Sequence, residues 1–470
     1  MDELTQEARR IVRNRLGSAL EEKASDALVL QLASQISSPA LAGVESVAPL
    51  AGSIIELRRE QEIHEEVRDV EEHLRHRSGF PQMRELLEQF EDLPETGERL
   101  IGGLVRQQEI RRAKQRFFAT SAPIRQRLEE VVSRSPSQER SGNEPVTEAC
   151  WLNQTVRAVG AGPALAEIAG AEEVGRLDLP RRLSAEIHAT ASVVGAPVGH
   201  GRGTTGAGLL VAVIDGEVAV GHPALQGRVV QRGNYTREPW GSPNGHGTAV
   251  AGIIASGDAG HRGIAPGVTI YNYKVLATHS WLNTDDFGGA LAIQQALEDG
   301  VHIANCSWGA GPAGDGTSRE ARACDNAWAL GLTLVKSAGN RGPHPGTLTT
   351  PADAEGTIVV GACNRAGRGV EDYSSRGPTA DGRERPHVVA PGGDSNPFSG
   401  IVSCVGSGGF GDSGIGTSFA APHVTGLLAL LLEENPSLDP DGLRQALFAL
   451  CRQQAGFGPN DQGQGLAVFA

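Results

Sequence analysis

The sequence predicts an α/β protein whose main domain is a doubly wound parallel sheet with helices on both faces. Beyond residue 205, short apolar runs alternate with helical patterns, and the runs are nearly continuous in apolar residues, as buried parallel strands are. At 470 residues, the chain has room for such a domain and for smaller ones before it. Most of its 62 glycines follow residue 140, whereas the earlier part is charged and poor in glycine, which is typical of exposed helices.

Three segments are predicted to precede the sheet domain. Residues 1–135 carry apolar residues at helical spacing among charges, for example over Ile54–Arg77, and we expect an α-helical module there. A Ser- and Pro-rich linker follows, and residues 145–185 then predict a small α+β segment. Residues 186–205 are small and glycine-rich and predict an exposed connector. The α+β segment is expected to contain a strand, a helix and a strand at Trp151–Val159, Pro163–Gly170 and Val174–Leu179.

The sheet domain, residues 206–470, is predicted from strands that alternate with helices. The strands are expected at Leu209–Ile214, Thr269–Val275, Ile303–Cys306, Thr333–Ser337, Thr357–Ala362 and His387–Ala390. The helices are expected at His246–Ala255, Phe287–Leu297, Thr317–Leu330 and Thr417–Leu432. In such folds ligands bind beyond the carboxyl ends of the strands, so we expect the functional residues there.

The charge balance of the chain limits its partners. With 42 Lys and Arg residues against 56 Asp and Glu residues, the formal net charge is −14. An acidic chain has no long-range attraction to a phosphate backbone or to anionic lipid, so we expect no nucleic acid and no membrane surface as partner. Because most of this acidity follows residue 140, it favours basic substrates.

The cysteines and the N-terminus indicate the compartment. The six cysteines are Cys150, Cys306, Cys324, Cys363, Cys404 and Cys451. None stands two or three residues from another, which excludes a redox CxxC pair and a zinc-finger spacing and favours free, buried thiols. Residues 1–10 lack the features of a secretory signal, and the aliphatic run near Leu427–Leu432 is too short to span a bilayer. We expect a cytoplasmic protein without a membrane span.

Three windows carry side chains suited to nucleophilic catalysis. Asp215 ends the apolar run LLVAVID, His246 stands between glycines in NGHGTAVAG, and Ser418 opens the helical pattern TSFAAPHVTG. A serine hydroxyl is a weak nucleophile that needs a base, and the base needs a group that orients it. A carboxylate at a strand end can orient an imidazole, and the N–H groups of a helix start favour developing negative charge.

These windows resemble the subtilisin-like serine proteases, the subtilase family or peptidase S8. The order Asp215, His246, Ser418, the glycines around the histidine and the GTSFAAP window carry the resemblance, which runs from about Thr205 to Leu450. It implies a subtilisin-like form of the predicted sheet and a catalytic triad of these three residues. It also implies a serine endopeptidase that acts on protein or peptide substrates through an acyl-enzyme, with no cofactor required for catalysis.

Two further windows fit this family. VKSAGN resembles the strand end that carries the oxyanion asparagine, which assigns that role to Asn340, and NCSWG resembles the edge strand that pairs with the substrate backbone. On residue type alone, Asn340 also fits a turn and Trp308 also fits a hydrophobic core. The resemblance assigns substrate binding to Ser307, Trp308, Gly309, Ala338 and Gly339.

The chain also departs from the family pattern. Gly216 and Glu217 follow Asp215, where the family has Thr or Ser and then Gly, so we expect different surroundings for the carboxylate. Ala224 replaces an aspartate that often binds calcium in the family, which leaves structural calcium open, and no metal ligands are predicted. Ala249 replaces a second family histidine. Two other histidines in family-like windows, His222 and His423, are expected to pack or hydrogen-bond outside the triad.

The N-terminal part is expected to control the enzyme. Residues 145–185 resemble the later part of a subtilase propeptide, which inhibits by laying its C-terminal tail into the substrate cleft. We therefore expect a self-cleavage site within residues 186–205, and a partner or trigger that docks on residues 1–135. Two alternatives to hydrolysis stay open: a peptide-processing transpeptidase or ligase that uses the same acyl-enzyme, and a pseudoprotease that binds peptides through Ser307–Gly309.

Overall fold

The computed structural model describes residues 193–279, 282–406 and 408–469, together with shorter stretches before them. Those stretches are 53–57, 110–119, 121–122, 125–126, 147–152, 155–158, 169, 174–178 and 184–185. The chain divides into two compact units. One holds Met1–Glu62 and Arg111–Arg181, and the other holds Ile63–Ile110 and Arg182–Ala470.

The first unit contains a four-stranded antiparallel sheet in the order β2-β3-β1-β4. Its strands are β1 (Ser53–Leu57), β2 (Thr147–Cys150), β3 (Thr155–Ala158) and β4 (Val174–Asp178). Strand β1 pairs with both β3 and β4. The helix expected over Ile54–Arg77 is therefore wrong for its first four residues, Ile54–Leu57. The segment SIIEL takes its hydrogen bonds from strands that come much later in the chain, and helical periodicity cannot reveal such partners.

The other expectations for the first 192 residues have mixed outcomes. Strand β4 confirms the strand at Val174–Leu179, and residues 110–119 are helical, as expected for this part of residues 1–135. The single strand expected at Trp151–Val159 is instead the second half of a hairpin, in which β2 and β3 flank a turn at residues 151–152. The remaining predicted helices, the linker and most of the connector lie outside the described residues, so the boundaries at 135, 145 and 185 stay predictions.

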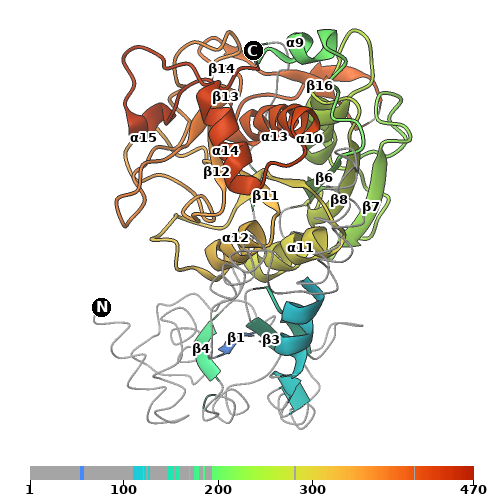
Figure 1. Cartoon of the computed structure of the whole chain (residues 1–470), viewed down its shortest axis with the longest axis vertical. Helices are drawn as coiled ribbons and strands as arrows, with labels where there is room; N and C mark the ends of the chain where they lie inside the picture. The colour runs from blue at the N-terminus through green and yellow to red at the C-terminus, as the bar shows by residue number, and fades with distance from the viewer. Residues whose placement is uncertain are drawn as a thin grey trace, which may run out of the picture. The chain divides into compact units, whose positions relative to one another are not determined.

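The second unit is built on a seven-stranded sheet in the order β13-β12-β11-β9-β6-β8-β7 (Figure 1). Its strands are β6 (Leu210–Gly216), β7 (Val229–Asn234), β8 (Thr269–Leu276), β9 (Ile303–Cys306), β11 (Thr333–Ser337), β12 (Ile358–Cys363) and β13 (Val388–Pro391). Every neighbouring pair is parallel, which confirms the predicted sheet. The edge strand β7 is not predicted from the sequence, because VVQRGN lacks an apolar run.

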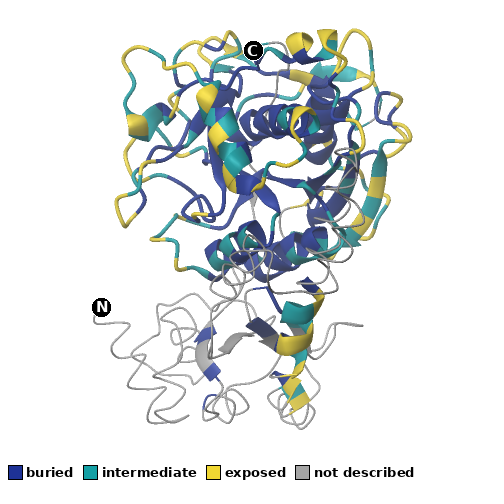
Figure 2. Cartoon of the chain, viewed as in Figure 1, coloured by how far each residue is buried: buried dark blue, intermediate teal, exposed yellow. Residues whose placement is uncertain are grey.

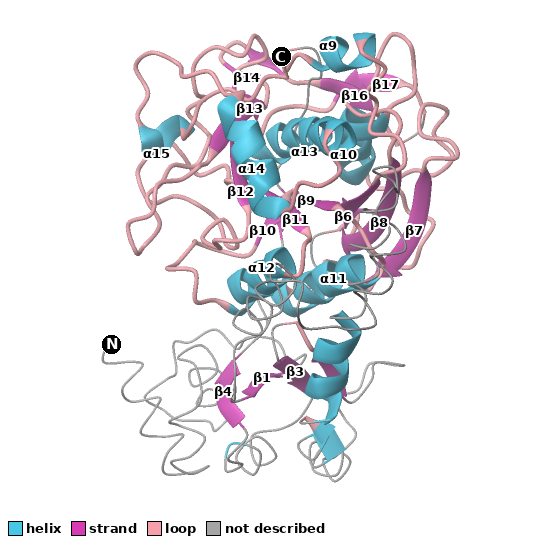
Figure 3. Cartoon of the chain, in the orientation of Figure 1, coloured by secondary structure: helices cyan, strands magenta, loops and turns pink. Residues whose placement is uncertain are grey.

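Helices cover both faces of this sheet (Figures 1 and 3). Helices α10 (Gly245–Ala255) and α13 (Thr417–Glu434) lie on one face, and α11 (Asp286–Glu298) and α12 (Arg319–Ala329) lie on the other. The side chains of Asn244, Asp285 and Ser318 each accept a backbone N–H at the start of the helix that follows. Nearly all of α10 and α13 is buried, as Figure 2 shows, so these helices form the core against which the catalytic-type residues are held.

Smaller elements complete the second unit. They are β5 (Ser184–Ala185), α9 (Ala196–Gly201), β10 (Trp308–Gly309), β14 (Asp394–Ser395), β15 (Phe398–Ser399), β16 (Val402–Cys404), β17 (Phe410–Asp412), α14 (Pro440–Ala449) and α15 (Pro459–Gln462). Asp439 caps α14 by accepting the N–H of Gly442 at 2.7 Å.

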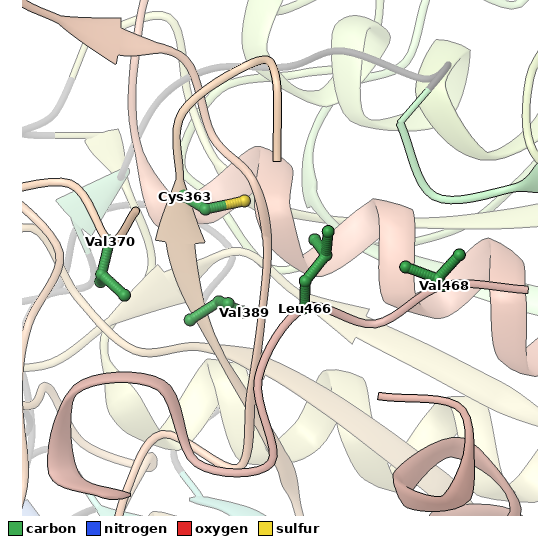
Figure 4. Packing of buried hydrophobic residues seen from close by; sticks show 5 residues of the cluster. All are labelled: Cys363, Val370, Val389, Leu466 and Val468. Atoms are coloured by element: carbon green, nitrogen blue, oxygen red, sulfur yellow. The ribbon is translucent and has the colours of Figure 1, made fainter. Parts of the chain in front are cut away.

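The C-terminal segment adds to the edge of the sheet. The N–H of Val389 in β13 donates to Gly465 O at 2.9 Å, and the N–H of Ala467 donates to Val389 O at 3.0 Å. Leu466 and Val468 pack with three buried side chains of the sheet edge, as Figure 4 shows. Those three are Cys363, Val370 and Val389. Residues beyond Leu450 therefore belong to the sheet unit.

The order of the strands defines where a site is expected. From β6 the chain first builds β7 and β8 on one side of β6, and it then crosses to β9 on the other side. The direction of winding thus reverses between β6 and β9, and ligands bind at the carboxyl ends of strands at such a switch point. The strand ends at this place are Gly216 and Cys306, with Ser337 of β11 on the neighbouring strand.

Candidate active site

Asp215 and His246 form a hydrogen-bonded pair at the switch point. Asp215 is the penultimate residue of β6, and His246 is the second residue of α10; both are buried. Nδ1 of His246 lies 2.6 Å from Oδ1 of Asp215, and the N–H of Gly216 donates to the same oxygen at 2.6 Å. A carboxylate in this position keeps the imidazole proton on Nδ1, so Nε2 is the basic nitrogen.

The close approach of β6 and α10 explains the glycines around this pair. A Cβ on Gly216 would lie 2.5 Å from Cβ of Asn244, and a Cβ on Gly247 would lie 2.4 Å from the carbonyl oxygen of Gly216. Asn244 caps α10, because its Oδ1 accepts the N–H of His246 at 2.7 Å. Oδ2 of Asp215 is buried without a hydrogen-bond partner among the described residues. The expectation that the surroundings of this carboxylate differ from the family pattern stays a prediction.

A buried ion cluster holds the segment that precedes α10. Lys274 of β8 is fully buried, and its Nζ lies 3.0 Å from Glu217 Oε2 and 2.9 Å from Glu238 Oε2. Glu217 also accepts the N–H groups of Gly241 and Ser242 at 2.8 and 3.1 Å. Burial by itself raises the pKa of Glu238, but the hydrogen bonds from Lys274 and Thr278 and the charge of Lys274 together hold that pKa below its ordinary value. The three catalytic windows do not predict this cluster; its sequence signal is a lysine inside the apolar strand YNYKVL.

Ser418 lies in the first turn of α13, against the end of β9. Pro422 has no N–H, so the carbonyl of Ser418, four residues earlier, has no helical donor. The hydroxyl of Ser307 donates to that carbonyl at 2.5 Å, and the hydroxyl of Ser418 donates to the carbonyl of Ser307 at 3.1 Å. Nδ2 of Asn305 donates to the Ser307 hydroxyl at 2.8 Å, and the hydroxyl of Thr425 donates to Oδ1 of Asn305 at 3.0 Å. This chain of hydrogen bonds fixes Ser418, and the sequence windows do not predict its two outer members, Asn305 and Thr425.

The structure brings the predicted base and nucleophile to one edge of the sheet. The ring of Phe419, the residue after Ser418, lies 5.1 Å from the ring of His246 between centroids. Helices α10 and α13, which carry these residues, lie side by side (Figure 1).

The side chain of Asn340 is held by Thr417. Its Oδ1 accepts the N–H and the hydroxyl of Thr417 at 2.8 and 3.0 Å, which leaves Nδ2 as the donor end of the amide. The N–H of Gly339 donates to the Thr417 hydroxyl at 3.1 Å. Gly339 has φ +115°, and a Cβ there would lie 2.7 Å from Oγ of Ser375, so only glycine fits. The sequence windows do not single out Thr417 as the partner of Asn340, although it stands directly before Ser418.

The edge predicted to bind substrate is paired in the structure. Trp308 of β10 lies opposite Ala185 of β5, and Gly309 lies opposite Ser184, in antiparallel register. Ser307 precedes this short strand. The side chain of Trp308 is fully buried, as a core residue is, and its Nε1 has no acceptor among the described residues. The backbone of Trp308 pairs with another strand, as expected for an edge that binds a peptide backbone. Its indole side chain lies in the core, as expected for a core residue.

The two other histidines are held by backbone oxygens. Nε2 of His222 lies 2.7 Å from Gly409 O, and Nδ1 of His423 lies 2.6 Å from Phe419 O. Burial lowers the pKa of His423 to about 4, so its ring is neutral near pH 7. Both histidines have the packing and hydrogen-bonding function expected from the sequence.

The residues around Ala224 do not fit a calcium ion. Ala224 has no side-chain oxygen, and its N–H donates to Nδ1 of His222 at 3.2 Å. Calcium takes six to eight oxygen ligands, mostly carboxylates and carbonyls. In the part of the chain that the structure describes, no group of three His, Cys, Asp or Glu side chains could hold a metal ion.

None of the described helices is long and apolar enough to cross a bilayer.

Comparisons with known proteins agree with this geometry. Residues 206–465 match the model of the subtilase family, Peptidase_S8. Serine protease AprX of Bacillus subtilis (strain 168) is 34% identical over 227 residues, which cover 43% of this chain and 51% of AprX. Subtilisin DY of Bacillus licheniformis is 33% identical over 214 residues, which cover 43% of this chain and 68% of that protein. The match thus spans about half the length of AprX.

A solved structure extends the likeness to the fold. Fervidolysin from Fervidobacterium pennivorans, a keratinolytic enzyme related to subtilisin, aligns with a TM-score of 0.57 and 21% identity. The alignment covers 74% of this chain and 58% of fervidolysin. The seven-stranded parallel sheet, its helices on both faces and the matched residues lead to one conclusion. The chain belongs to the subtilase family, peptidase S8, the subtilisin-like serine proteases.

Proposed function

We propose that the chain is a serine endopeptidase. One observation carries the proposal: Asp215 orients His246 through a 2.6 Å hydrogen bond at the strand edge where Ser418 begins α13. The amide of Asn340, held by Thr417 on its oxygen side, supports the same proposal. These groups are a nucleophile, a base, an orienter and an oxyanion donor, which is the set that acyl transfer needs.

In the proposed reaction, His246 takes the proton of Ser418 as Oγ attacks the carbonyl carbon of a peptide bond. Asp215 stabilises the imidazolium that forms. Nδ2 of Asn340 and the N–H of Ser418 at the helix start hold the oxyanion. His246 then gives its proton to the leaving amine, and water releases the acyl group with the same base. No step uses a metal ion or an organic cofactor.

Covalent labelling separates this proposal from a peptide-binding pseudoprotease. A fluorophosphonate reagent is expected to modify wild-type protein at Ser418 and to leave Ser418→Ala unlabelled. Labelling of His246→Ala is expected to fall by at least about a hundredfold, since the hydroxyl then lacks its base. Wild-type protein that stays unlabelled, while it still binds peptides, would support the pseudoprotease.

Product analysis separates hydrolysis from peptide ligation. The acyl-enzyme can react with water or with an amine, and the transpeptidase alternative requires the amine to win. Mass spectra of products formed with an added amine acceptor are expected to show hydrolysed peptide as the main species. A main product that carries the acceptor would instead assign the chain to peptide processing.

We further propose that the N-terminal part restrains the protease until the chain cuts itself. In support, β5, which directly precedes the connector at residues 186–205, pairs with the edge strand β10. A segment in that place occupies the edge at which a substrate backbone would pair. Residues 145–185 would then act as an inhibitor, and residues 1–135 as the part on which a partner or trigger docks.

Parallel purification of wild type and Ser418→Ala tests the self-cleavage. The inactive variant is expected to keep the full mass of 49.2 kDa, and wild type is expected to shorten. If wild type keeps the full mass while it cleaves added substrates, self-cleavage is wrong. For the docking proposal, the sharper deletion removes residues 1–50, because β1 belongs to the sheet with β3 and β4. Unchanged activity, partners and solubility after that deletion would overturn it.

We propose that the protease works in the reducing environment of the cytoplasm. In support, all six cysteines are free thiols. Proteins of oxidising compartments commonly pair such residues in disulfides. Fractionation of the source cells is expected to recover the protein with cytoplasmic enzymes, and its recovery from the culture medium would contradict the proposal.

A further inference from the structure

A cavity of about 420 Å³ lies in the second unit, and none of the proposed catalytic residues lines it. Three segments that are distant in the sequence meet there. Thr205 precedes β6, Arg228 directly precedes β7, and the connection between α10 and β8 contributes Gly257, Arg262 and Pro266. Two of these side chains are cationic, and no described aspartate or glutamate lines the cavity.

The guanidinium group of Arg228 is held at one end and has donors to spare at the other. Its Nη1 donates to the carbonyl oxygen of Pro266. Its Nε and Nη2, which form the adjacent edge of the group, have no acceptor among the described residues. A Cβ on Gly257 would lie 2.9 Å from Nη2 and 3.1 Å from Nε, so the glycine leaves this edge uncovered. Arg228 therefore presents a positioned pair of N–H donors.

Another arginine of this chain shows what such an edge binds. Nε and Nη2 of Arg232 donate to the two carboxylate oxygens of Asp299 at 2.8 and 2.5 Å. Two parallel N–H donors match two oxygens of one oxyanion, which is how guanidinium groups bind carboxylates and phosphates. At Arg228 no described carboxylate takes this place, so the edge is suited to an oxyanion from solution.

Arg262 adds a second positive charge to the same cavity. Its side chain forms no hydrogen bond and no ion pair with the residues that the structure describes. Two like charges beside one cavity repel each other, and an anion bound in the cavity offsets that repulsion. The hydroxyl of Thr205, which also has no hydrogen-bond partner in the described part of the chain, is a further donor at the cavity wall.

Carboxylates in neighbouring segments have other partners. Glu433 accepts the N–H groups of Thr205 and Gly206 at 2.6 and 2.5 Å. Asp258 accepts the N–H of His261 at 2.8 Å. Neither carboxylate lines the cavity. In a chain with 56 acidic against 42 basic residues, two arginines that share a cavity without an acidic partner indicate a site for an anion.

We propose that this cavity binds a doubly charged oxyanion of the phosphate class. The Nε–Nη2 edge of Arg228 would bind two of its oxygens, and Arg262 and the Thr205 hydroxyl would bind the others. Two cationic side chains match two negative charges, which favours a dianion over a single carboxylate. The site goes beyond the proposed peptidase function and does not depend on it. Because it joins three distant segments, a bound anion is expected to stabilise the second unit.

Thermal unfolding tests the site in the full chain. The Ser418→Ala variant serves as the parent protein, so that the proposed self-cleavage does not interfere. Sodium phosphate at about 20 mM is expected to raise its melting temperature by at least about 2 °C over sodium chloride of equal ionic strength. Sulfate is expected to act like phosphate, and acetate is expected to have less than half the effect. No rise with phosphate or sulfate would overturn the site, and an equal rise with acetate would overturn the phosphate class.

Substitutions separate this site from the general stabilisation that phosphate and sulfate give to proteins. In Arg228→Gln and in Arg262→Gln the rise is expected to fall by at least half, and in the double variant further still. Arg368→Gln is the matched control, because Arg368 is an exposed arginine that does not line the cavity, and its rise is expected to equal that of the parent. Equal rises in all variants would show a general salt effect and overturn the site. If Arg228→Gln does not fold, Arg262→Gln decides, since that side chain is exposed.

Calorimetric titration with inorganic phosphate provides a second test. The parent protein is expected to bind one more phosphate per chain than the double variant, and Arg368→Gln is expected to bind as many as the parent. Equal binding by the parent and the double variant would place the anion elsewhere and overturn the proposal. Neither test involves peptide cleavage, so a failure of this proposal is distinguishable from a failure of the proposed function.

Discussion

Thr417 shows how a single residue can hold the side chain that we propose as the oxyanion donor. It holds Oδ1 of Asn340 with its N–H and its hydroxyl, and the same hydroxyl accepts the N–H of Gly339. The amide of Asn340 can therefore point its nitrogen in only one direction. Thr417 is not one of the proposed reacting groups, so we propose it as a positioning residue for Asn340, whose amide would act mainly in the transition state.

Asn340→Leu is expected to lower kcat by about 10²–10³ with little change in KM, because it removes a transition-state donor. Thr417→Val is expected to lower kcat by about tenfold, since its N–H still holds Oδ1 while the hydroxyl contacts are lost. In the Asn340→Leu background, Thr417→Val is expected to cost little more, because the residue it positions is gone. Steady-state kinetics of wild type, the two single variants and the double variant measure these losses in kcat. Fully additive losses in the double variant would show that Thr417 does not act through Asn340.

Asp325 in α12 is a carboxyl group that folding makes less acidic. Burial raises the pKa of its carboxyl group to about 6. The N–H of Gly356 donates to this carboxyl group at 2.7 Å and lowers the pKa, but burial has the larger effect. The folded protein therefore keeps this proton to a higher pH than the unfolded chain does. Stability from this group is fully present below the unfolded pKa and is lost as the pH rises through about 6.

Asp325→Asn is expected to stabilise the protein near pH 7 by about 2 kcal/mol relative to its effect at pH 4, since the amide does not ionise. Urea unfolding between pH 4 and pH 7 measures the difference. Asp381→Asn is the comparison variant, because the stability contributed by Asp381 depends on pH in the opposite direction. The hydrogen bond from Arg383 lowers the pKa of Asp381, so its stabilisation is present at high pH and is lost as the pH falls. A difference for Asp325→Asn that does not grow with pH would show that its carboxyl titrates normally.

At the scale of elements, the close approach of β6 and α10 positions the hydrogen-bonded pair of Asp215 and His246. Asp215 and His246 come from a strand and a helix that approach closely enough to exclude a Cβ at Gly216 and Gly247. Asn244 and the cluster of Lys274, Glu217 and Glu238 hold the preceding segment from the other side. The 2.6 Å contact of the pair thus follows from the packing of two elements.

Gly247→Ala is expected to destabilise the protein by about 1–3 kcal/mol, because its Cβ would press on the backbone of Gly216. It is also expected to lower kcat, since α10 must shift away from Asp215. Gly245→Ala is the matched control in the same helix, where an added Cβ meets no atom within 4 Å. Urea midpoints and kinetics compare the two variants, and equal stabilities would show that α10 can move without cost.

At the scale of the whole molecule, the net charge is expected to affect the encounter with substrates. The net charge of −14 is expected to favour basic substrates through long-range attraction. Such attraction between exposed charges is screened by salt, so it is expected to affect the rate of encounter and to weaken as the ionic strength rises.

The thiols give a prediction for the entire chain. All six cysteines are free, and burial raises the pKa of Cys306, Cys404 and Cys451 to about 12. The thiolate is the reactive form, so native protein is expected to react with a thiol reagent about a hundredfold more slowly than protein in urea. Its melting temperature is expected to be the same with and without a reducing agent. A lower melting temperature in the reducing agent would reveal a disulfide.

The sequence by itself determined the parallel sheet and the position of the catalytic windows. Apolar runs such as LLVAVID and the helical pattern after Ser418 are local signals, and the six strands and four helices they predict are present. The residues Asp215, His246 and Ser418 stand at the ends and starts of these elements, so their approach to one edge follows from the parallel arrangement.

Only the tertiary structure decided which distant residues meet. Strand β1 joins a sheet whose other members begin after residue 140, and Thr417 finds Asn340 across 77 positions of the chain. Lys274 forms an ion pair with Glu238, and Lys336 pairs in register with Cys306. These partners too are distant in the sequence. Hydrogen bonds and buried charges need specific partners, and the sequence places those partners far apart. Local periodicity therefore predicts the elements, whereas the packing of these elements determines the site.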